Sequence, residues 1–344
     1  MISSILLNEY KGISEIIGAS AEKLKWKSVL VTGANGLIAS YLIEYLQYLN
    51  SEYDYNIQIY ALSRSTDKLQ KRFKNPDNLI FVQQDLNEGL NISQNFDYII
   101  HAASNAHPAA FSKDPVGTMK TNLLGTMNLL DMIKDTSAKF LYLSTGEIYG
   151  NNVDKAFVEE DAGLVDTKLV RSCYPESKRA AETLCMAYSE QYGIRTNIAR
   201  LCYVYGPAIT EDNSRADAQF LRNAVKRTDI VMKSEGHQRR TWCYIADAVS
   251  GLLYILLNGG KSEVYNIANP NSVASVREYA QIMSEISGVK LKFELPDEIE
   301  RKGYSKPADS VLDSAKLRDF GWKPLYDLKT GVYHTLSQTE AAVC

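Results

Sequence analysis

The sequence has few cysteines and no pair of them at a redox or metal-binding spacing. Its 344 residues include five cysteines, and none belongs to a C-x-x-C motif. An odd number of unpaired cysteines does not suit a disulfide framework and is typical of reduced thiols. The four histidines are scattered along the chain, so no metal site is predicted. The cysteines are Cys173, Cys185, Cys202, Cys243 and Cys344.

Long apolar runs and a strong net charge are also lacking. No stretch approaches the ~20 apolar residues of a membrane span, and the N-terminus lacks the pattern of a signal peptide. We therefore expect a cytoplasmic protein without membrane contact. The formal net charge is −3, so no nucleic-acid partner is expected, and an anionic ligand must be held by a few placed arginines and backbone amides. A chain of this length favours one large α/β domain with a smaller lobe.

A strand, a glycine turn and a helix follow a short N-terminal segment. Residues 1–26 are predicted to form a helical extension without chemistry of its own. Residues 28–32 are an apolar, β-branched run typical of a buried parallel strand. The G-A-N-G turn after it allows a tight bend and the approach of a pyrophosphate to a helix N-terminus, so a dinucleotide site is predicted. Its residues are Gly33, Asn35, Gly36, Leu37 and Ile38.

The end of the second strand bears on the choice of cofactor. The run at 57–63 ends in Ser63 and Arg64, and no acidic residue precedes Asp67. An acidic side chain near this position binds the ribose 2′-hydroxyl of NAD, whereas an arginine accommodates a 2′-phosphate. The cofactor is therefore NADP or NAD, with NADP slightly favoured by Arg64. A solvated loop arginine is the alternative.

Three further strands alternate with helical segments, which predicts a parallel sheet with helices on both faces. The strands end near residues 85, 101 and 145. Ligands of such sheets bind beyond the carboxyl ends of the strands, so residues there should share one rim with the glycine turn. The additional cofactor-binding residues predicted on this rim are Asp85, Leu86, Ala102, Ala103 and Ser104.

The stretch SCYPESKRAAETL places Tyr174 four positions before Lys178. Residues four apart lie on the same face of a helix, and Pro175 is tolerated only in a first turn. The spacing therefore puts a phenol at the mouth of a helix and an amine one turn inside. On spacing alone, an ordinary helix start with a surface lysine is an alternative.

Together these motifs resemble the extended short-chain dehydrogenase/reductases, and more narrowly the nucleotide-sugar epimerase/dehydratase family. T-G-x-x-G, S-T-x-E-x-Y-G, Y-x-x-x-K and N-L-L-G-T with Asn122 occur in the family's order, and the resemblance covers about residues 27–335. It implies a Rossmann-type doubly wound parallel sheet with a smaller C-terminal substrate lobe, and a homodimer. The dinucleotide-binding domain is expected over 27–196, with a returning segment near 240–270. The substrate lobe is expected over 197–239 and 271–344.

The resemblance also implies roles for individual side chains. Tyr174 would transfer the proton, Lys178 would lower the pKa of Tyr174 and hold the cofactor ribose, and Thr145 would hydrogen-bond the substrate oxygen. Asn122, Tyr174 and Lys178 would contact the cofactor. Arg240 would contact the diphosphate of a nucleoside-diphosphate sugar, whose hydroxyl or ketone, expected at C4, exchanges a hydride with the nicotinamide.

Two departures from the family's pattern reduce the number of reactions that the chain could catalyse. Related 4,6-dehydratases carry an aspartate where this chain has Gly146, which cannot protonate a leaving group. Glu147 remains, as in the family's decarboxylases, with a buried structural carboxylate as the alternative. Tyr203 replaces the usual asparagine of R-x-x-N-x-Y-G-P, so substrate contacts there are expected to differ.

Several functions stay open from the sequence. The enzyme could epimerise or decarboxylate a UDP-uronate-like sugar on a retained cofactor, or reduce a 4-keto sugar nucleotide one way with NADPH. A steroid or flavonoid ketone fits less well, because Arg240 favours a diphosphate. A non-catalytic dinucleotide sensor is a different class, disfavoured because Tyr174, Lys178 and Thr145 occur together.

Overall fold

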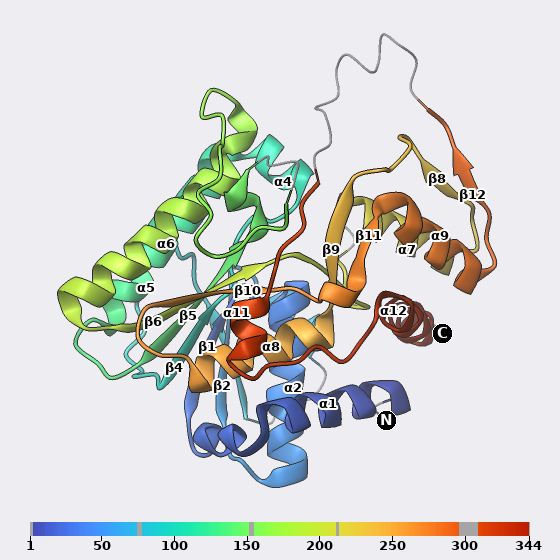
Figure 1. The fold of residues 1–344 in the computed structure, drawn as a ribbon. Coiled ribbons are helices and arrows are strands. Elements are labelled where there is room, and N and C mark those ends of the chain that lie inside the picture. Colours follow the sequence, from blue (N-terminus) through green and yellow to red (C-terminus); the bar gives the residue numbers. More distant parts are fainter. Residues whose placement is uncertain (1–2, 74–77, 151–154, 211–212, 296–308, 344) are drawn as a thin grey trace.

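A seven-stranded parallel sheet forms the centre of the molecule, in the order β10-β6-β5-β4-β1-β2-β3 (Figure 1). A computed structural model describes residues 3–73, 78–150, 155–210, 213–295 and 309–343. All neighbouring strands of the sheet run parallel, which confirms the predicted fold class. The strands are β1 (Ser28–Thr32), β2 (Gln58–Ser63), β3 (Leu79–Gln83), β4 (Tyr98–His101), β5 (Lys139–Thr145), β6 (Arg195–Leu201) and β10 (Glu263–Ile267).

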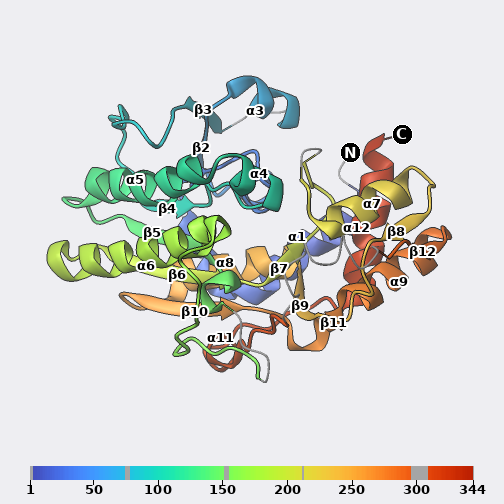
Figure 2. The same ribbon diagram turned by 90° about the horizontal axis from the view of Figure 1, so that it is seen from above.

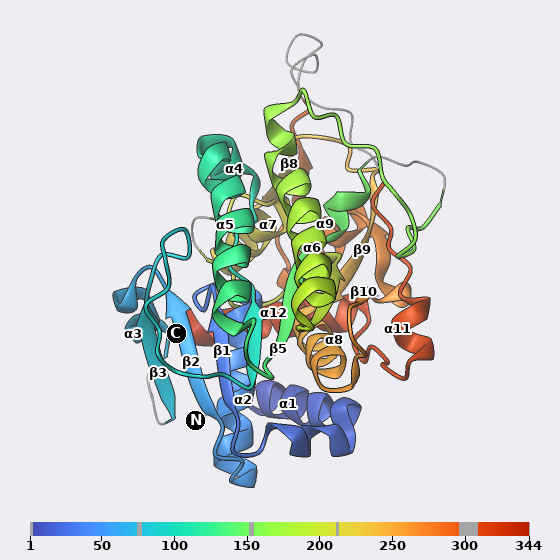
Figure 3. The same ribbon diagram turned by 90° about the vertical axis from the view of Figure 1, so that its left-hand side faces the viewer.

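Helices cover both faces of this sheet, because its strands are apolar on both sides (Figure 3). One face carries the neighbouring helices α5 and α6, and the other carries α2, α8 and α1. Short helices connect the strand ends on the rim. The helices of this part are α1 (Ser4–Ile17), η1 (Gly18–Leu24), α2 (Leu37–Tyr53), α3 (Thr66–Arg72), α4 (Pro108–Lys113), α5 (Pro115–Ile133), η2 (Gly146–Tyr149), η3 (Val170–Ser172), α6 (Cys173–Tyr192), α8 (Ile245–Asn258) and α11 (Ala315–Asp319).

The strand order reverses between β1 and β4. From β1 the chain proceeds outward to β2 and β3, and from β4 it proceeds the other way to β5 and β6. At such a switch point the connections leave in opposite directions and open a crevice at the carboxyl ends of the two strands. The glycine turn after β1 and the residues after β4 therefore face each other across the crevice.

A smaller lobe stands beside the carboxyl edge of the sheet (Figure 2). It contains a three-stranded sheet, β11-β9-β7, and the two-stranded sheet β12-β8. After β9, α8 and β10 return to the central sheet. The elements of the lobe are β7 (Tyr203–Tyr205), α7 (Ala216–Val225), β8 (Ile230–Met232), β9 (Arg239–Tyr244), η4 (Pro270–Ser272), β11 (Val273–Ser275), α9 (Val276–Ser287), β12 (Leu291–Phe293) and α12 (Leu328–Val343).

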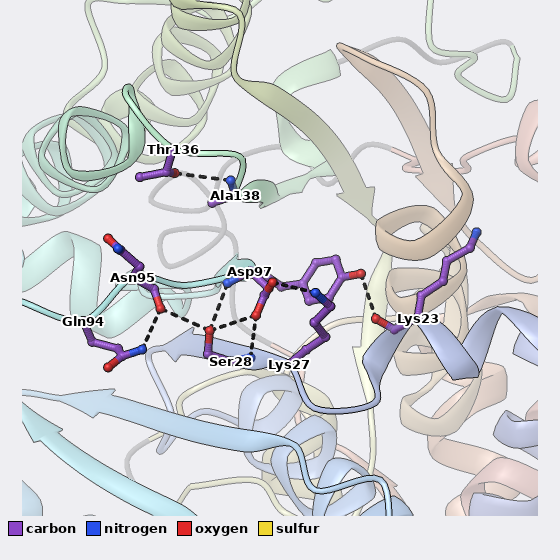
Figure 4. A network of polar contacts seen from close by, with 9 residues as sticks. Lys23, Lys27, Ser28, Gln94, Asn95, Asp97, Thr136 and Ala138 are labelled. Atoms are coloured by element: carbon purple, nitrogen blue, oxygen red, sulfur yellow. Dashed lines mark hydrogen bonds and ion pairs between the residues drawn. The ribbon is translucent and has the colours of Figure 1, made fainter.

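The opposite, amino-terminal edge of the sheet is held by a polar network (Figure 4). The Asp97 carboxylate accepts hydrogen bonds from the backbone N–H and the hydroxyl of Ser28, at 2.9 and 3.1 Å, and pairs with Lys27 Nζ at 2.9 Å. These contacts lower the pKa of Asp97, although partial burial opposes them. Tyr98 donates to the Lys23 carbonyl at 3.0 Å. The network ties the starts of β1 and β4 to the N-terminal segment and fixes their register.

The N-terminal helix α1 is part of the core. Glu9 is fully buried and joins four elements: its carboxylate accepts from Tyr41 of α2 and Tyr244 of β9, each at 2.7 Å, and from Gln338 of α12 at 3.0 Å. His334 Nδ1 lies 2.7 Å from the same carboxylate. Within the predicted extension, Ser4–Leu24 is helical, and α1 ties the C-terminal helix to α2 and β9.

We expect Glu9→Leu to destabilise the protein, because two buried and two partly buried polar groups would lose their shared partner. The cost should be about 3 kcal/mol or more, which lowers Tm by roughly 5 to 10 °C in a protein of this size. Thermal unfolding measures the shift. Glu15→Leu is the matched control, because Glu15 is exposed on the same helix; equal Tm values for the two variants would contradict the structural role of Glu9.

Candidate active site

The carboxyl ends of the strands open into one cavity of about 1290 Å³, which extends from the glycine turn to the smaller lobe. Every predicted site residue except Asn122 lines it. The predicted cofactor residues in its wall are Gly33, Asn35, Gly36, Leu37, Ile38, Ser63, Arg64, Asp85, Leu86, Ala102, Ala103, Ser104, Tyr174 and Lys178. The predicted catalytic and substrate residues in its wall are Thr145, Glu147, Tyr203 and Arg240, together with the same Tyr174 and Lys178.

The glycine turn leaves no room for a side chain at position 33. Gly33 has a φ of 66°, and a Cβ there would lie 2.8 Å from the Cα of Ala103. Gly36 donates its N–H to the Gly33 carbonyl at 2.8 Å and is the N-cap of α2. Because Gly36 provides no side-chain cap, the first amides of α2 remain available beside the cavity. This turn and helix N-terminus fit a pyrophosphate.

The far end of the cofactor side is basic. Asn35 donates to the Ser63 hydroxyl at 2.9 Å and so joins the glycine turn to the end of β2. Arg64 follows, and α3 adds Lys68, Lys71 and Arg72 to the same wall. Arg72 donates to the Ala208 carbonyl at 3.1 Å, while its buried Nε has no hydrogen-bond partner. Sequence reasoning missed these three; the basic spacing in TDKLQKR was the available signal.

Tyr174 lies at the start of α6, in its first turn with Pro175, as the spacing predicted. Its ring stacks on Phe111 with centroids 5.4 Å apart and is 6% exposed. Burial raises the pKa of Tyr174 above its ordinary value, and the Glu147 charge raises it further. A hydrogen bond with the Thr145 hydroxyl and the charge of Arg215 act in the opposite direction. With only the protein's own groups around it, the Tyr174 phenol is therefore protonated at neutral pH.

Lys178 is buried one turn further along α6. Its amine donates to the Leu143 carbonyl at 2.6 Å and lies 4.6 Å from the ring centre of Tyr142. Burial lowers its pKa to about 7, against the opposing influence of Glu182. The expectation that Lys178 lowers the pKa of Tyr174 is not confirmed, because the protein groups that act on this phenol are others. The alternative of a surface lysine is wrong.

Glu147 sits on the substrate side of the cavity. Its Oε2 lies 3.0 Å from the guanidinium of Arg171, in an ion pair without hydrogen-bond geometry. Arg171 in turn lies over the ring of Phe111. Next to Glu147, a Cβ on Gly146 would come within 2.8 Å of Leu312, a buried side chain. Position 146 thus carries no acidic side chain, and the Leu312 side chain packs beside its backbone.

Tyr203 and three polar side chains form the wall toward the smaller lobe. The Arg240 guanidinium lies 4.0 Å from the ring centre of Tyr203, and that of Arg215 lies 5.5 Å from it. Arg215 also pairs with Asp217 at 3.2 Å. Sequence reasoning missed the cavity residues Arg171 and Arg215, and Phe111 behind Tyr174, since no local motif marks them.

Asn122 lies away from the cavity, between two helices. It is fully buried in α5 and donates to the Ser177 hydroxyl of α6 at 2.8 Å. Its side-chain amide oxygen, Oδ1, has no hydrogen-bond partner. In this structure Asn122 positions α6, and with it Tyr174 and Lys178.

No three His, Cys, Asp or Glu side chains within the described ranges are placed to hold a metal ion. No helix in this part of the chain is long and apolar enough to cross a bilayer. The four cysteines up to residue 243 are free thiols, and Cys344 lies outside the described residues.

Comparisons with known proteins agree with this geometry. Residues 29–268 match the model of the NAD dependent epimerase/dehydratase family. The chain is 33% identical over 305 residues to UDP-glucuronic acid decarboxylase 6 of Arabidopsis thaliana, covering 88% of this chain and 86% of the relative.

Two solved structures share the fold. UDP-glucose 4-epimerase of Thermotoga maritima, solved with UDP-glucose, has a TM-score of 0.77 at 22% identity, covering 92% of this chain and 100% of that one. UDP-glucuronic acid 4-epimerase of Bacillus cereus, solved with UDP-glucuronic acid and NAD, has a TM-score of 0.73 at 22% identity, covering 90% and 99%. At this identity the likeness establishes the fold alone.

Proposed function

Because the chain belongs to the NAD-dependent epimerase/dehydratase family, we propose that its cavity oxidises a hydroxyl, at C4, of a nucleoside-diphosphate sugar. The observation that carries this proposal is the convergence of Tyr174, Thr145 and Lys178 on one wall, between a dinucleotide turn and a pair of arginines. The uncapped start of α2 and the orphaned Nε of Arg72 fit a bound dinucleotide on the other side. When bound, its nicotinamide supplies the hydride acceptor and donor.

Different side chains bind the sugar hydroxyl, take its proton and contact the cofactor. Thr145 holds the sugar hydroxyl and Tyr174 takes its proton as the hydride leaves. Burial, and then the charge of Glu147, raise the pKa of Tyr174, and in this buried place any positive charge that comes close acts strongly on it. With a pKa of about 7, Lys178 exchanges its proton near neutral pH and can donate to a ribose hydroxyl.

The outcome after oxidation is proposed to be decarboxylation of a nucleoside-diphosphate uronate. A ketone at C4 stands β to the C5 carboxylate, so carbon dioxide can leave without an acid for a departing hydroxyl. That agrees with Gly146, which provides no acidic side chain for a departing hydroxyl. The relatives named as UDP-glucuronic acid decarboxylases support this outcome. The ketone is then reduced again at the same site.

A second candidate is one-way reduction of a 4-keto sugar nucleotide with exchangeable NADPH. The observation that favours it is the basic end of the cavity, with Arg64, Lys68, Lys71 and Arg72. Mass spectrometry of the sugar product separates the two, because decarboxylation removes carbon dioxide and ketone reduction adds two hydrogens.

Tyr174→Phe tests the proposed chemistry. We expect binding of UDP and dinucleotide to change less than about twofold, while turnover falls roughly 10² to 10⁴-fold, because the proton acceptor is lost. Turnover and binding are measured on the same preparation. Tyr192→Phe is the control, since Tyr192 is an exposed tyrosine on the same helix. Unchanged turnover in Tyr174→Phe would rule the mechanism out.

The cofactor preference is proposed to be NADP over NAD. Arg64→Ala should weaken NADPH binding about tenfold or more, because a guanidinium–phosphate contact is lost, and NADH binding by less than threefold. Fluorescence titration with both dinucleotides gives the ratio, and NADH serves as the internal control. Equal losses for both would show that Arg64 does not read a 2′-phosphate.

The proposed assembly is a homodimer through α5 and α6. These helices share a shallow apolar groove at Leu123, Ala180, Leu184 and Ala187, near the exposed Met119. Light scattering should give twice the 38.5 kDa mass of one chain, and Ala187→Arg should shift it to a monomer, because a buried charge disfavours association. A monomeric parent protein at micromolar concentration would refute this arrangement.

A further inference from the structure

One aromatic ring supports two cations in the wall of the cavity. Tyr203 begins β7 and is paired in register with Trp242 of β9. The guanidiniums of Arg240 and Arg215 both lie over its ring, at 4.0 and 5.5 Å from the ring centre. All four side chains line the cavity. Like charges brought together at one place must be held there by some attraction, and the ring face provides it.

The two arginines differ in what else holds them. Arg215 pairs with Asp217 at 3.2 Å and donates to the Val204 carbonyl at 3.3 Å. Arg240 has no ion pair within the described ranges, and its Nε is buried without a hydrogen-bond partner. Stacking on Tyr203 therefore fixes the orientation of Arg240 and leaves its donors free. A guanidinium that lines a cavity and has a buried, unpartnered Nε indicates an anionic ligand.

We propose that Tyr203 is a positioning residue that holds Arg240 beside Arg215 as a two-cation clamp for the diphosphate of the substrate. This inference rests on the proposed function, since it assumes a nucleoside-diphosphate ligand. A ring suits the task better than a short amide, because the ring face attracts both guanidiniums without using their N–H donors. Each guanidinium can then present its planar donors to phosphate oxygens.

A competing role for Tyr203 is a direct contact through its hydroxyl. Glu147 and the arginines act electrostatically on this phenol, and it acts in turn on Tyr174, so the hydroxyl lies near the reaction centre. The two roles depend on different atoms. Phenylalanine keeps the ring and removes the hydroxyl, whereas leucine removes both.

The test is calorimetric titration with UDP of the full chain and its Tyr203→Phe, Tyr203→Leu and Arg240→Ala variants. We expect Tyr203→Phe to bind UDP within threefold of the parent and Tyr203→Leu to bind about tenfold more weakly, which corresponds to about 1.4 kcal/mol. Dinucleotide binding should stay unchanged in each variant, which shows that the fold is intact. Tyr203→Asn replaces Tyr203→Leu if the latter does not fold.

A double-mutant cycle shows whether Tyr203 acts through Arg240. If it does, Tyr203→Leu should weaken UDP binding less than threefold when Arg240 is already alanine. Additive losses would overturn the positioning role, as would equal weakening by phenylalanine and leucine, or parent-like binding by Tyr203→Leu. If the parent chain itself does not bind UDP, the proposed function fails instead.

Discussion

The close contact between the glycine turn and the strand across the crevice is the constraint on which the site depends. A Cβ at Gly33 would lie 2.8 Å from the Cα of Ala103, so only glycine lets β1 and the residues after β4 approach this closely. That approach brings the start of α2, the end of β2 and the end of β5 to one edge. A larger residue at position 33 would separate the two halves of the cofactor side before it touched any ligand.

Desolvation shapes the chemistry of this edge. Lys178 has a pKa of about 7 and Tyr174 a raised pKa for the same reason, because burial disfavours their charged forms. Charges carried by ligands therefore act strongly on both groups. Three further arginines line the same cavity, of which Arg171 and Arg215 are ion-paired and Arg240 stacks on Tyr203. The site thus has a buried reaction centre at Tyr174 and Lys178, and a cationic wall that faces an anionic substrate.

Much of this arrangement could be predicted from the sequence, because its signals are local. The first strand has the bounds that its pattern predicted, and Gly33, Asp85, Ala102 and Thr145 share the predicted rim. Arg171 and Arg215 at the cavity, and Phe111 against the Tyr174 ring, could not be predicted, because the fold brings them there from short helices and loop ends. The role of Glu9 could not be predicted for the same reason, since its hydrogen-bond partners lie 32 to 329 positions away in the sequence.

The most direct test of the account is to follow the hydrogen on C4 of the sugar. Parent protein loaded with oxidised dinucleotide is incubated with UDP-glucuronate, or with UDP-glucose, deuterated at C4. The account predicts deuterium on the nicotinamide ring of reduced dinucleotide when the protein is denatured within a single turnover, before the ketone takes the deuteride back, and mass spectrometry detects it. Dinucleotide that stays free of deuterium with both sugars, although both bind, would contradict hydride transfer at C4.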